Sequence, residues 1–381
     1  MTEGCSQPQA HPVAVFTGSR AEYGLMRHLI RAIEAEPGLA LQLIVSGSHL
    51  SQSHGATVAE IGADAIPISA CVPLSLDASP VPSMAALTAE ALEGVGRALE
   101  QLQPRLLILL GDRYEAFAAA AAAHLQGVPV VHLHGGETTE GAVDNRLRHA
   151  ITQLSSWHFT AAEPYRQRVI AMGQPPERVF NVGPMVLDGL LAAQPANRND
   201  FEQSTGFRFA KRNLLITYHP ETLLPDRGVA GFEALLTALE QIPCHVLLTH
   251  PNADAGSEQL LQRLQAFQKR HPERCWALPS LGQQRYLAAL QLFEAMAGNS
   301  SSGVIEAPLL AMPVLNIGGR QAGRLRHGPV HDVPAEAQAI ACGLEQVLAV
   351  GERQYWPRPC PSPAAAPAVA ITAWLASKHW S

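Results

Sequence analysis

Short apolar runs alternate with amphipathic stretches along the whole chain. Residues 13–17, 106–110, 214–218 and 313–317 form runs dominated by Val, Leu and Ile. Runs of this kind predict strands that are buried on both faces of a parallel sheet. Between the runs, apolar residues recur three or four positions apart, as in residues 83–103, and this spacing predicts helices. Regular alternation of the two elements predicts a doubly wound α/β architecture.

The alternation occurs in two successive series, and 381 residues are too many for one ordinary core. We therefore predict two Rossmann-like domains, an N-terminal one over residues 1–185 and a C-terminal one over residues 186–356. Residues 357–367 are rich in proline and alanine and predict a semi-rigid connector. A last helix within residues 368–381 is expected to pack back on the first domain.

Composition excludes several classes of function. The formal net charge is −6, lysines are few, and no basic stripe suggests nucleic acid. The six cysteines are scattered, without a C-x-x-C pair or a metal-type spacing, so neither a disulfide framework nor a metal site is expected. The N-terminus lacks the pattern of a signal peptide, and no apolar run approaches the ~20 residues that span a membrane. We expect a cytoplasmic protein that uses no metal or cofactor.

Polar side chains follow directly after the apolar runs. In a parallel sheet these positions share one edge, where open α/β sheets bind their ligands. The densest group, residues 132–149, contains histidines, arginines and acids, among them Glu137 and Asp144. A polar turn before a helix starting near Asp144 is the alternative. Turns seldom need so many titratable groups, so we predict a functional site.

Three other strand ends in the first series carry candidate residues. Arg20 lies in a small-residue turn, residues 18–24, whose backbone amides can bind an anion, although such turns often carry an arginine for solubility alone. His49 is either a ligand contact or an ordinary loop histidine, and sequence logic favours the ordinary role. Asp112 is expected to point into the ligand-binding edge, and it could also, or instead, cap the following helix.

The second series ends its strands in a similar way. The glycine- and serine-rich run over residues 298–303 predicts a phosphate cradle, which Arg320 at the next strand end would complete. Glu306 would repel a phosphate, so we expect it to accept hydrogen bonds from a ribose diol or to cap a loop. An isolated histidine such as His219 is usually structural, but its place at a strand end beside arginines favours function.

Seven short motifs occur in a fixed order along the chain. They are residues 18–24, 111–115, 134–137, 148–152, 218–222, 298–303 and 318–321. Together they resemble the hydrolysing UDP-N-acetylglucosamine 2-epimerases over nearly the whole chain. The resemblance implies a fold like that of GT-B glycosyltransferases, with the active site in the interdomain cleft. It also implies a homodimer or homotetramer.

The reaction implied is the conversion of UDP-N-acetylglucosamine and water to N-acetylmannosamine and UDP, for sialic acid synthesis. A sister branch of the family acts on UDP-2,4-diacetamido-2,4,6-trideoxyglucose, on the route to legionaminic acid. The motifs do not separate the two branches. UDP-sugar and UDP are therefore the expected substrate and product.

The resemblance also assigns roles to individual residues. Asp112, Glu137 and Asp144 match the catalytic acids, and His219 matches the catalytic histidine. The nucleotide-sugar contacts are matched by Arg20, Arg113, Asn252, Asp254, Ser300, Ser301, Glu306 and Arg320, and His49 is a further candidate. Two departures affect details: Ser19 stands where threonine is usual, and Asn145 stands where an acid is common.

The chemistry explains why such residues are needed. A sugar C2–H has no adjacent carbonyl, so UDP must leave C1 first or ahead in the transition state. The positive charge that develops makes the C2 proton acidic enough for a carboxylate, which gives a 2-acetamidoglucal and UDP. Water then adds to C1 while C2 is reprotonated from the other face. Arg20, Arg320, His219 and the serine run are expected to stabilise the diphosphate, and the three acids to move protons.

Three alternative functions remain open at this stage. The first is a nonhydrolysing 2-epimerase, which the sequences of motifs 111–115 and 134–137 disfavour. The second is a GT-B glycosyltransferase, for which no acceptor site is marked. The third is a catalytically silent nucleotide-sugar-binding protein, which the intact acids and His219 disfavour. Release of UDP would distinguish this third function from catalysis.

Overall fold

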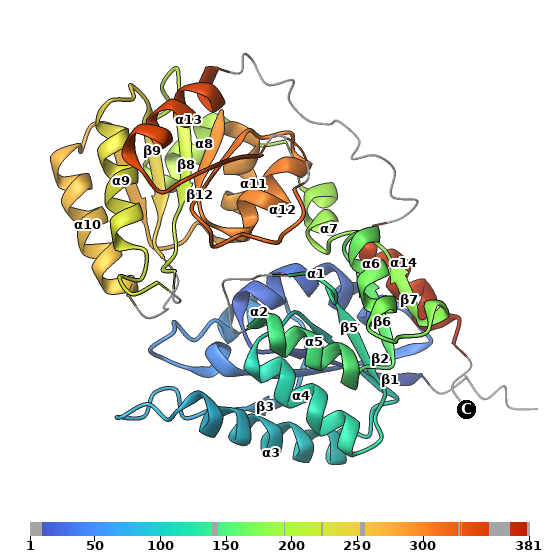
Figure 1. Cartoon of the computed structure of the whole chain (residues 1–381). Coiled ribbons are helices and arrows are strands. Elements are labelled where there is room, and N and C mark those ends of the chain that lie inside the picture. Colours follow the sequence, from blue (N-terminus) through green and yellow to red (C-terminus); the bar gives the residue numbers. More distant parts are fainter. Residues whose placement is uncertain are drawn as a thin grey trace, which may run out of the picture. The chain divides into compact units, whose positions relative to one another are not determined.

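The computed structural model is shown in Figure 1. It describes residues 10–138, 144–193, 195–221, 224–251, 256–326, 328, 330–349 and 366–378. The chain divides into two compact units. The first unit contains residues 10–137, 144–191 and 366–378, and the second consists chiefly of the described residues between 192 and 349.

The first unit is built on a parallel sheet of seven strands. The strands are β1 (His11–Thr17), β2 (Leu39–Ser46), β3 (Ile68–Val72), β4 (Leu106–Leu110), β5 (Val130–Leu133), β6 (Trp157–Thr160) and β7 (Val179–Asn181). Their order is β3-β2-β1-β4-β5-β6-β7, and every pair is parallel. The order reverses between β1 and β4, which creates a topological switch point at the carboxyl ends of these strands.

Helices cover both faces of this sheet. They are α1 (Arg20–Ala35), α2 (Val58–Ala63), α3 (Met84–Leu102), α4 (Tyr114–Leu125), α5 (Asp144–Leu154), α6 (Glu163–Ala171), α7 (Val186–Ala192) and α14 (Pro367–Ala376). Apolar residues of α3, α4 and α5 pack on one face, and those of α1, α2 and α14 pack on the other. Both cores consist of fully buried Val, Leu, Ile and Ala side chains, as expected for a parallel sheet.

Helix α14 completes the core of the first unit from far along the sequence. Its Trp374 ring packs against Trp157 and Phe159, with ring centroids 5.0 and 5.1 Å away. The main-chain N–H of Ala368 donates to both carboxylate oxygens of Asp188 at 3.1 Å, so an acid satisfies an amide in the first turn of the helix. Aromatic packing and this hydrogen bond hold the helix in place.

The second unit repeats the plan with six parallel strands. The strands are β8 (Asn213–Thr217), β9 (His245–Thr249), β10 (Cys275–Leu278), β11 (Ala295–Gly298), β12 (Val314–Ile317) and β13 (Val330–Val333). The helices are α8 (Arg198–Thr205), α9 (Val229–Glu240), α10 (Ser257–Arg270), α11 (Gly282–Leu292), α12 (Ser301–Leu309) and α13 (Ala337–Ala349). The strand order β10-β9-β8-β11-β12-β13 places a second switch point between β8 and β11.

The predicted pair of Rossmann-like parallel domains is confirmed. The predicted helix start near Asp144 and the helix over residues 83–103 are also confirmed, as α5 and α3. Strands β3, β10 and β13 were not predicted. All three are edge strands with partly exposed residues, so they lack the continuous apolar run of a central strand. Within the described part of the chain, no helix has the length and apolar character needed to cross a membrane.

Candidate active site

The carboxyl ends of β4 and β5 bring two predicted acids together in the first unit. Asp112 follows β4 and forms an ion pair with Arg148 of α5. The same guanidinium donates through Nη1 to the main-chain oxygen of Glu137, which follows β5, at 2.9 Å. The N-cap of α4 is Arg113 rather than Asp112, so the alternative capping role of Asp112 is wrong. Asp112 is held by an arginine from another helix instead.

The carboxylate of Glu137 has its own partner. Oε1 lies 2.9 Å from Nδ1 of His134, and the main-chain N–H of Met185 donates to Nε2 of the same ring at 3.0 Å. An amide can only donate, so Nε2 is the unprotonated nitrogen and Nδ1 carries the hydrogen. His134 is therefore a hydrogen-bond donor, through Nδ1, to the buried Glu137. Its backbone is left-handed, with a φ of 63°, which turns the chain out of β5 towards Glu137.

A second histidine fixes the loop that carries Asp112. Nε2 of the buried His132 lies 2.9 Å from the carbonyl oxygen of Gly111, and Nδ1 lies 3.2 Å from Oγ1 of Thr152 on α5. A carbonyl can only accept, so Nε2 of His132 is protonated. Burial lowers the pKa of His132 to about 3, and the ring is neutral at pH 7. It links the ends of β4 and β5 to α5.

Asp144, the third predicted acid, is the first residue of α5. It lies four residues before Arg148, so both side chains project from the same face of the helix. An acid in the first turn of a helix is favoured by the helix dipole. Arg148 thus relates the three predicted acids to one another. It contacts Asp112 and the main chain of Glu137, and it shares a helix face with Asp144.

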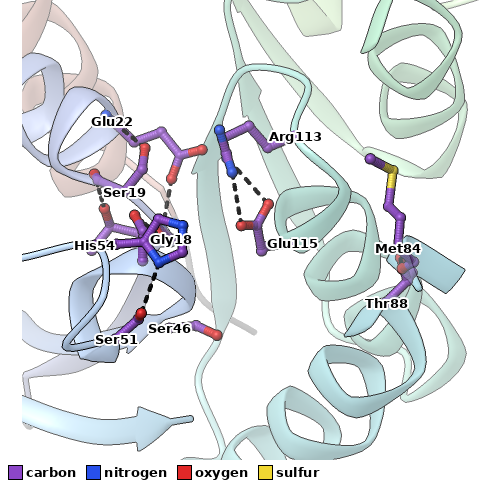
Figure 2. A network of polar contacts seen from close by, with 12 residues as sticks. Gly18, Ser19, Glu22, Ser46, Ser51, His54, Met84, Thr88, Arg113 and Glu115 are labelled. Atoms are coloured by element: carbon purple, nitrogen blue, oxygen red, sulfur yellow. Dashed lines mark hydrogen bonds and ion pairs between the residues drawn. The ribbon is translucent and has the colours of Figure 1, made fainter. Parts of the chain in front are cut away.

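The switch point beside β1 and β4 carries a charged cluster, drawn in Figure 2, in which two buried glutamates lie beside the partly exposed Arg113. Glu115 of α4 is fully buried and accepts two hydrogen bonds from Arg113, at 3.2 Å from Nε and 3.1 Å from Nη2. Glu22 of α1 lies across from them and accepts the main-chain N–H of Gly18 at 2.7 Å. Burial raises the pKa of Glu22 from 4.5 to about 7, with the negative charge of Glu115 adding to the rise and Arg113 opposing it.

This cluster changes the prediction for the turn after β1. The turn was expected to offer free amides to an anion, but Glu22 already occupies the Gly18 amide and the Ser19 hydroxyl accepts from the Glu22 amide at 3.4 Å. Arg20 is half-exposed, with Nη1 3.9 Å from Glu60. Two amides of the turn thus bond to side chains of the protein itself, and a role of Arg20 in binding an anion stays a prediction.

His49 is fully buried within the first unit. Its ring nitrogens contact the hydroxyls of Thr17 at 3.1 Å and of Thr57 at 2.9 Å. Burial lowers the pKa of His49 to about 4, so the ring is neutral. These contacts favour the ordinary structural role. A role of His49 in ligand binding stays a prediction.

The second unit places His219, Asn299 and Arg320 at the carboxyl ends of β8, β11 and β12. The Asn299 side chain accepts the main-chain N–H of His219 at 2.7 Å and donates to its carbonyl at 2.9 Å. Nη1 of Arg320 donates to the main-chain oxygen of Asn299 at 3.1 Å. Burial, with a further effect of Arg320, lowers the pKa of His219 to about 3. With this pKa His219 is neutral at pH 7, and its ring can both donate and accept a hydrogen bond.

The serine run forms the start of α12. Ser300 is the N-cap and its hydroxyl accepts from the amide of Ser302 at 3.4 Å, and Ser301 is the first helical residue. The Ser302 hydroxyl contacts both Tyr286 of α11 and Glu306. Burial raises the pKa of Glu306. Glu306 therefore accepts a hydrogen bond from Ser302, one turn earlier in α12. It lies near the N-terminus of α12, where the sequence predicts a phosphate site.

The remaining predicted contacts, Asn252 and Asp254, lie outside the described residues. Among the described residues, no group of three or more His, Cys, Asp or Glu side chains has an arrangement that could hold a metal ion. Cys71, Cys244, Cys275 and Cys342 are free thiols.

Most of the chain matches one known protein family. Residues 31–360 match the family model described as UDP-N-acetylglucosamine 2-epimerase. The chain belongs to this family. The match includes the switch point of the second unit, the three predicted acids and His219, and begins after β1 and the turn that carries Arg20.

Two curated relatives are similar over most of their length. The UDP-N,N'-diacetylbacillosamine 2-epimerase (hydrolyzing) of Legionella pneumophila is 37% identical over 332 residues, which is 87% of either chain. The GDP/UDP-N,N'-diacetylbacillosamine 2-epimerase (hydrolyzing) of Campylobacter jejuni is 34% identical over 315 residues, which is 82% of either chain.

A solved structure shares the fold. The UDP-GlcNAc 2-epimerase of Neisseria meningitidis bound to UDP-GlcNAc superposes with a TM-score of 0.78 at 18% identity, over 96% of this chain and all of that one. At this identity the likeness supports the fold alone.

Sequence reasoning missed the residues that hold the predicted ones in place. Arg148 was noticed only as part of a motif, and His134, Asn299 and the pair of Glu22 and Glu115 were given no role. One signal was available: Arg148 follows Asp144 by four residues, the spacing that puts two side chains on one helix face.

Proposed function

We propose that this chain is a hydrolysing 2-epimerase of UDP-linked 2-acetamido sugars. In the proposed reaction the C1–O bond to UDP breaks with its electron pair leaving on the diphosphate. A carboxylate removes the C2 proton, which gives a 2-acetamidoglucal. Water then adds to C1 and C2 gains a proton on the opposite face, so that one water is consumed and UDP and the C2-epimeric sugar are released.

The contact of Arg148 with both the Asp112 carboxylate and the Glu137 main chain carries this proposal. Proton removal and return at opposite faces of C2 need two separately held acid–base groups. Asp112 and Glu137 follow neighbouring strands and have different partners, Arg148 for one carboxylate and His134 for the other. Different surroundings allow two carboxyl groups to take different protonation states. Asp144 is the third candidate.

The second unit supplies groups suited to the leaving diphosphate. Arg320 brings a permanent positive charge, and the start of α12 adds the partial charge of a helix N-terminus. The neutral His219 can donate a hydrogen bond or accept a proton. These groups favour UDP departure because they stabilise the charge that develops on the leaving oxygen.

Two donor sugars are candidates. The relatives at 37% and 34% identity are named for UDP-N,N'-diacetylbacillosamine, which is the 2,4-diacetamido-2,4,6-trideoxy donor of the sister branch. These names support the diacetamido donor. UDP-N-acetylglucosamine is supported equally, because the motifs are shared by both branches and a relative named a polysialic acid biosynthesis protein is also 34% identical.

Proton NMR in deuterium oxide tests the reaction and the donor together. The purified chain is incubated with each donor in turn, and light scattering on the same sample measures whether it is the expected homodimer or homotetramer. We expect free UDP and a manno-configured sugar deuterated at C2 from one of the donors. Isomerisation without UDP release would indicate a nonhydrolysing epimerase. No change in either donor would disprove the proposed function.

A further inference from the structure

Arg148 is a deeply buried arginine that contacts a predicted acid. Only 3% of its side chain is exposed, against 22% for its partner Asp112. A guanidinium retains its charge in a protein and is costly to bury, so it needs well-placed acceptors. Arg148 finds them in the Asp112 carboxylate and in the main-chain oxygen of Glu137 at 2.9 Å.

These two acceptors come from two different strand ends. Asp112 follows β4 and Glu137 follows β5, whereas Arg148 reaches both from α5. A guanidinium is planar and holds its nitrogens in a rigid fork, so one side chain sets the distance between the two segments. The Glu137 carboxylate is held separately by His134. Arg148 therefore fixes where Glu137 sits and His134 fixes how its carboxylate points.

Burial argues against another role for Arg148. A diphosphate would need an exposed guanidinium, and Arg148 could meet one only by releasing Asp112. The Asp112 carboxylate is 22% exposed, so it stays accessible to a substrate while Arg148 holds it. Arg168 of α6 provides the comparison, because its Nη1 donates to the carbonyl oxygen of Gly136 in the same turn and contacts no predicted acid there.

We propose that Arg148 is a positioning residue for the proposed epimerisation, which locks the carboxylate of Asp112 at a fixed place relative to Glu137. This inference rests on the proposed function. Misplacement of a reacting group by about 1 Å can slow a reaction about 100-fold, so the contact matters for turnover even though Arg148 touches no substrate.

Three variants test the proposal. Arg148→Met keeps the apolar stem and removes both contacts, and Arg148→Lys keeps the charge but not the fork. Arg168→Met is the matched control, because it removes an arginine of α6 that donates to the same turn, at Gly136. We expect kcat to fall about 100-fold in Arg148→Met and about 10-fold in Arg148→Lys, with KM and UDP affinity within about twofold of wild type. Arg168→Met should keep kcat within about threefold.

Two kinetic outcomes would overturn the proposal. Equal losses in Arg148→Met and Arg168→Met would show that only the stability of the turn matters. A rise in KM at unchanged kcat would make Arg148 a binding residue. If Arg148→Met does not fold, the Lys variant and the control give the same comparison.

A measurement without substrate separates this inference from the proposed function. The Nη nitrogens of Arg148 are followed by NMR in protein labelled with ¹⁵N-arginine, in wild type and in Asp112→Asn. We expect restricted rotation of the guanidinium in wild type and faster rotation in the variant. Unchanged rotation would overturn the inference. An inactive wild type that shows the expected rotation would instead remove the proposed function.

Discussion

Nδ1 of His134 donates a hydrogen bond to the Glu137 carboxylate because the Met185 amide occupies the other ring nitrogen. The tautomer is thus set by a main-chain group. His134 orients the acid through this hydrogen bond. Variants whose side-chain amide replaces either Nδ1 or Nε2 can measure how much this orientation contributes to kcat.

We expect His134→Asn to retain more activity than His134→Gln. The Asn amide nitrogen can replace Nδ1 and still donate to Glu137, and Asn tolerates the left-handed backbone. Gln places its amide near Nε2 and loses that donor. A hydrogen bond to a charged group contributes about 1.5–3 kcal/mol, so we expect kcat to differ about 10- to 100-fold between the variants. Equal kcat values would show that the Glu137 contact is unimportant.

Asp112→Asn and Glu137→Gln should abolish turnover while UDP still binds. Each change removes a group that can exchange a proton, and general acid–base catalysis contributes about 100-fold or more. UDP release measures turnover and titration calorimetry measures UDP affinity. Glu163→Gln, at an exposed position of α6, serves as the control and should match wild type. A near wild-type rate in either acid variant would remove that residue from the proposed mechanism.

Arg320→Ala should weaken UDP binding. Loss of one charge-assisted hydrogen bond, about 1.5–3 kcal/mol, corresponds to an affinity about 10- to 100-fold lower in titration calorimetry. Arg212→Ala is the matched control. Arg212 lies just before the start of β8, at the opposite end of the strand from His219, and forms an ion pair with Glu345. Unchanged UDP affinity in Arg320→Ala would show that this arginine does not bind the nucleotide.

Gly298→Ala should disrupt the site of the second unit. A Cβ there would lie 2.0 Å from the main-chain oxygen of Thr217, and the φ of 132° disfavours any other residue. We expect this variant to lose UDP binding and to unfold at lower temperature. Gly319→Ala is the control, because a Cβ at Gly319 meets no atom within 4 Å. Similar behaviour of the two variants would mean that the β8–β11 contact is more tolerant than the structure indicates.

Glu22→Gln should change how stability depends on pH. The folded pKa of Glu22 is about 7 and the reference value is 4.5, so the folded chain keeps a proton that the unfolded chain loses. The free energy of unfolding of wild type therefore falls as pH rises from 4.5 to 7, by about 3 kcal/mol from this group. The Gln variant retains an acceptor for Gly18 and lacks this fall.

Urea denaturation at pH 5 and pH 8 measures the difference. The variant should gain stability relative to wild type at the higher pH. Glu60→Gln, a change at an exposed acid of α2, should follow the wild-type profile. Parallel profiles for wild type and Glu22→Gln would show that Glu22 ionises normally, despite its burial beside Glu115.

The central strands could be predicted from sequence because burial on both faces leaves a continuous apolar run. Residues 106–110 are the clearest case, and β4 comprises those five residues. The edge strand β13 has the sequence Val-His-Asp-Val, with its middle residues exposed. Its strand character comes from pairing with β12, which a local pattern does not record.

The same distinction applies to the candidate site. The motifs placed Asp112 and Glu137 at strand ends, because the end of an apolar run marks that position. The partners of these acids depend on which helix returns to which strand end. Arg148 meets Asp112 across 36 residues and Met185 meets His134 across 51, and no local pattern reports such contacts. The Glu22 carboxylate at the Gly18 amide was missed because either a bound anion or a side chain satisfies that amide.

Helix α14 has a consequence for the order of events during synthesis. Domains generally fold as units, the N-terminal one first, as the chain leaves the ribosome. Here Ala368, Ile371 and Leu375 belong to the core of the first unit, yet they are translated after the entire second unit. A nascent chain that has reached residue 349 still exposes the aromatic surface around Trp157 and Phe159. The first unit to be translated is therefore the last to be completed, and we expect a chain truncated within the second unit to leave this aromatic surface uncovered.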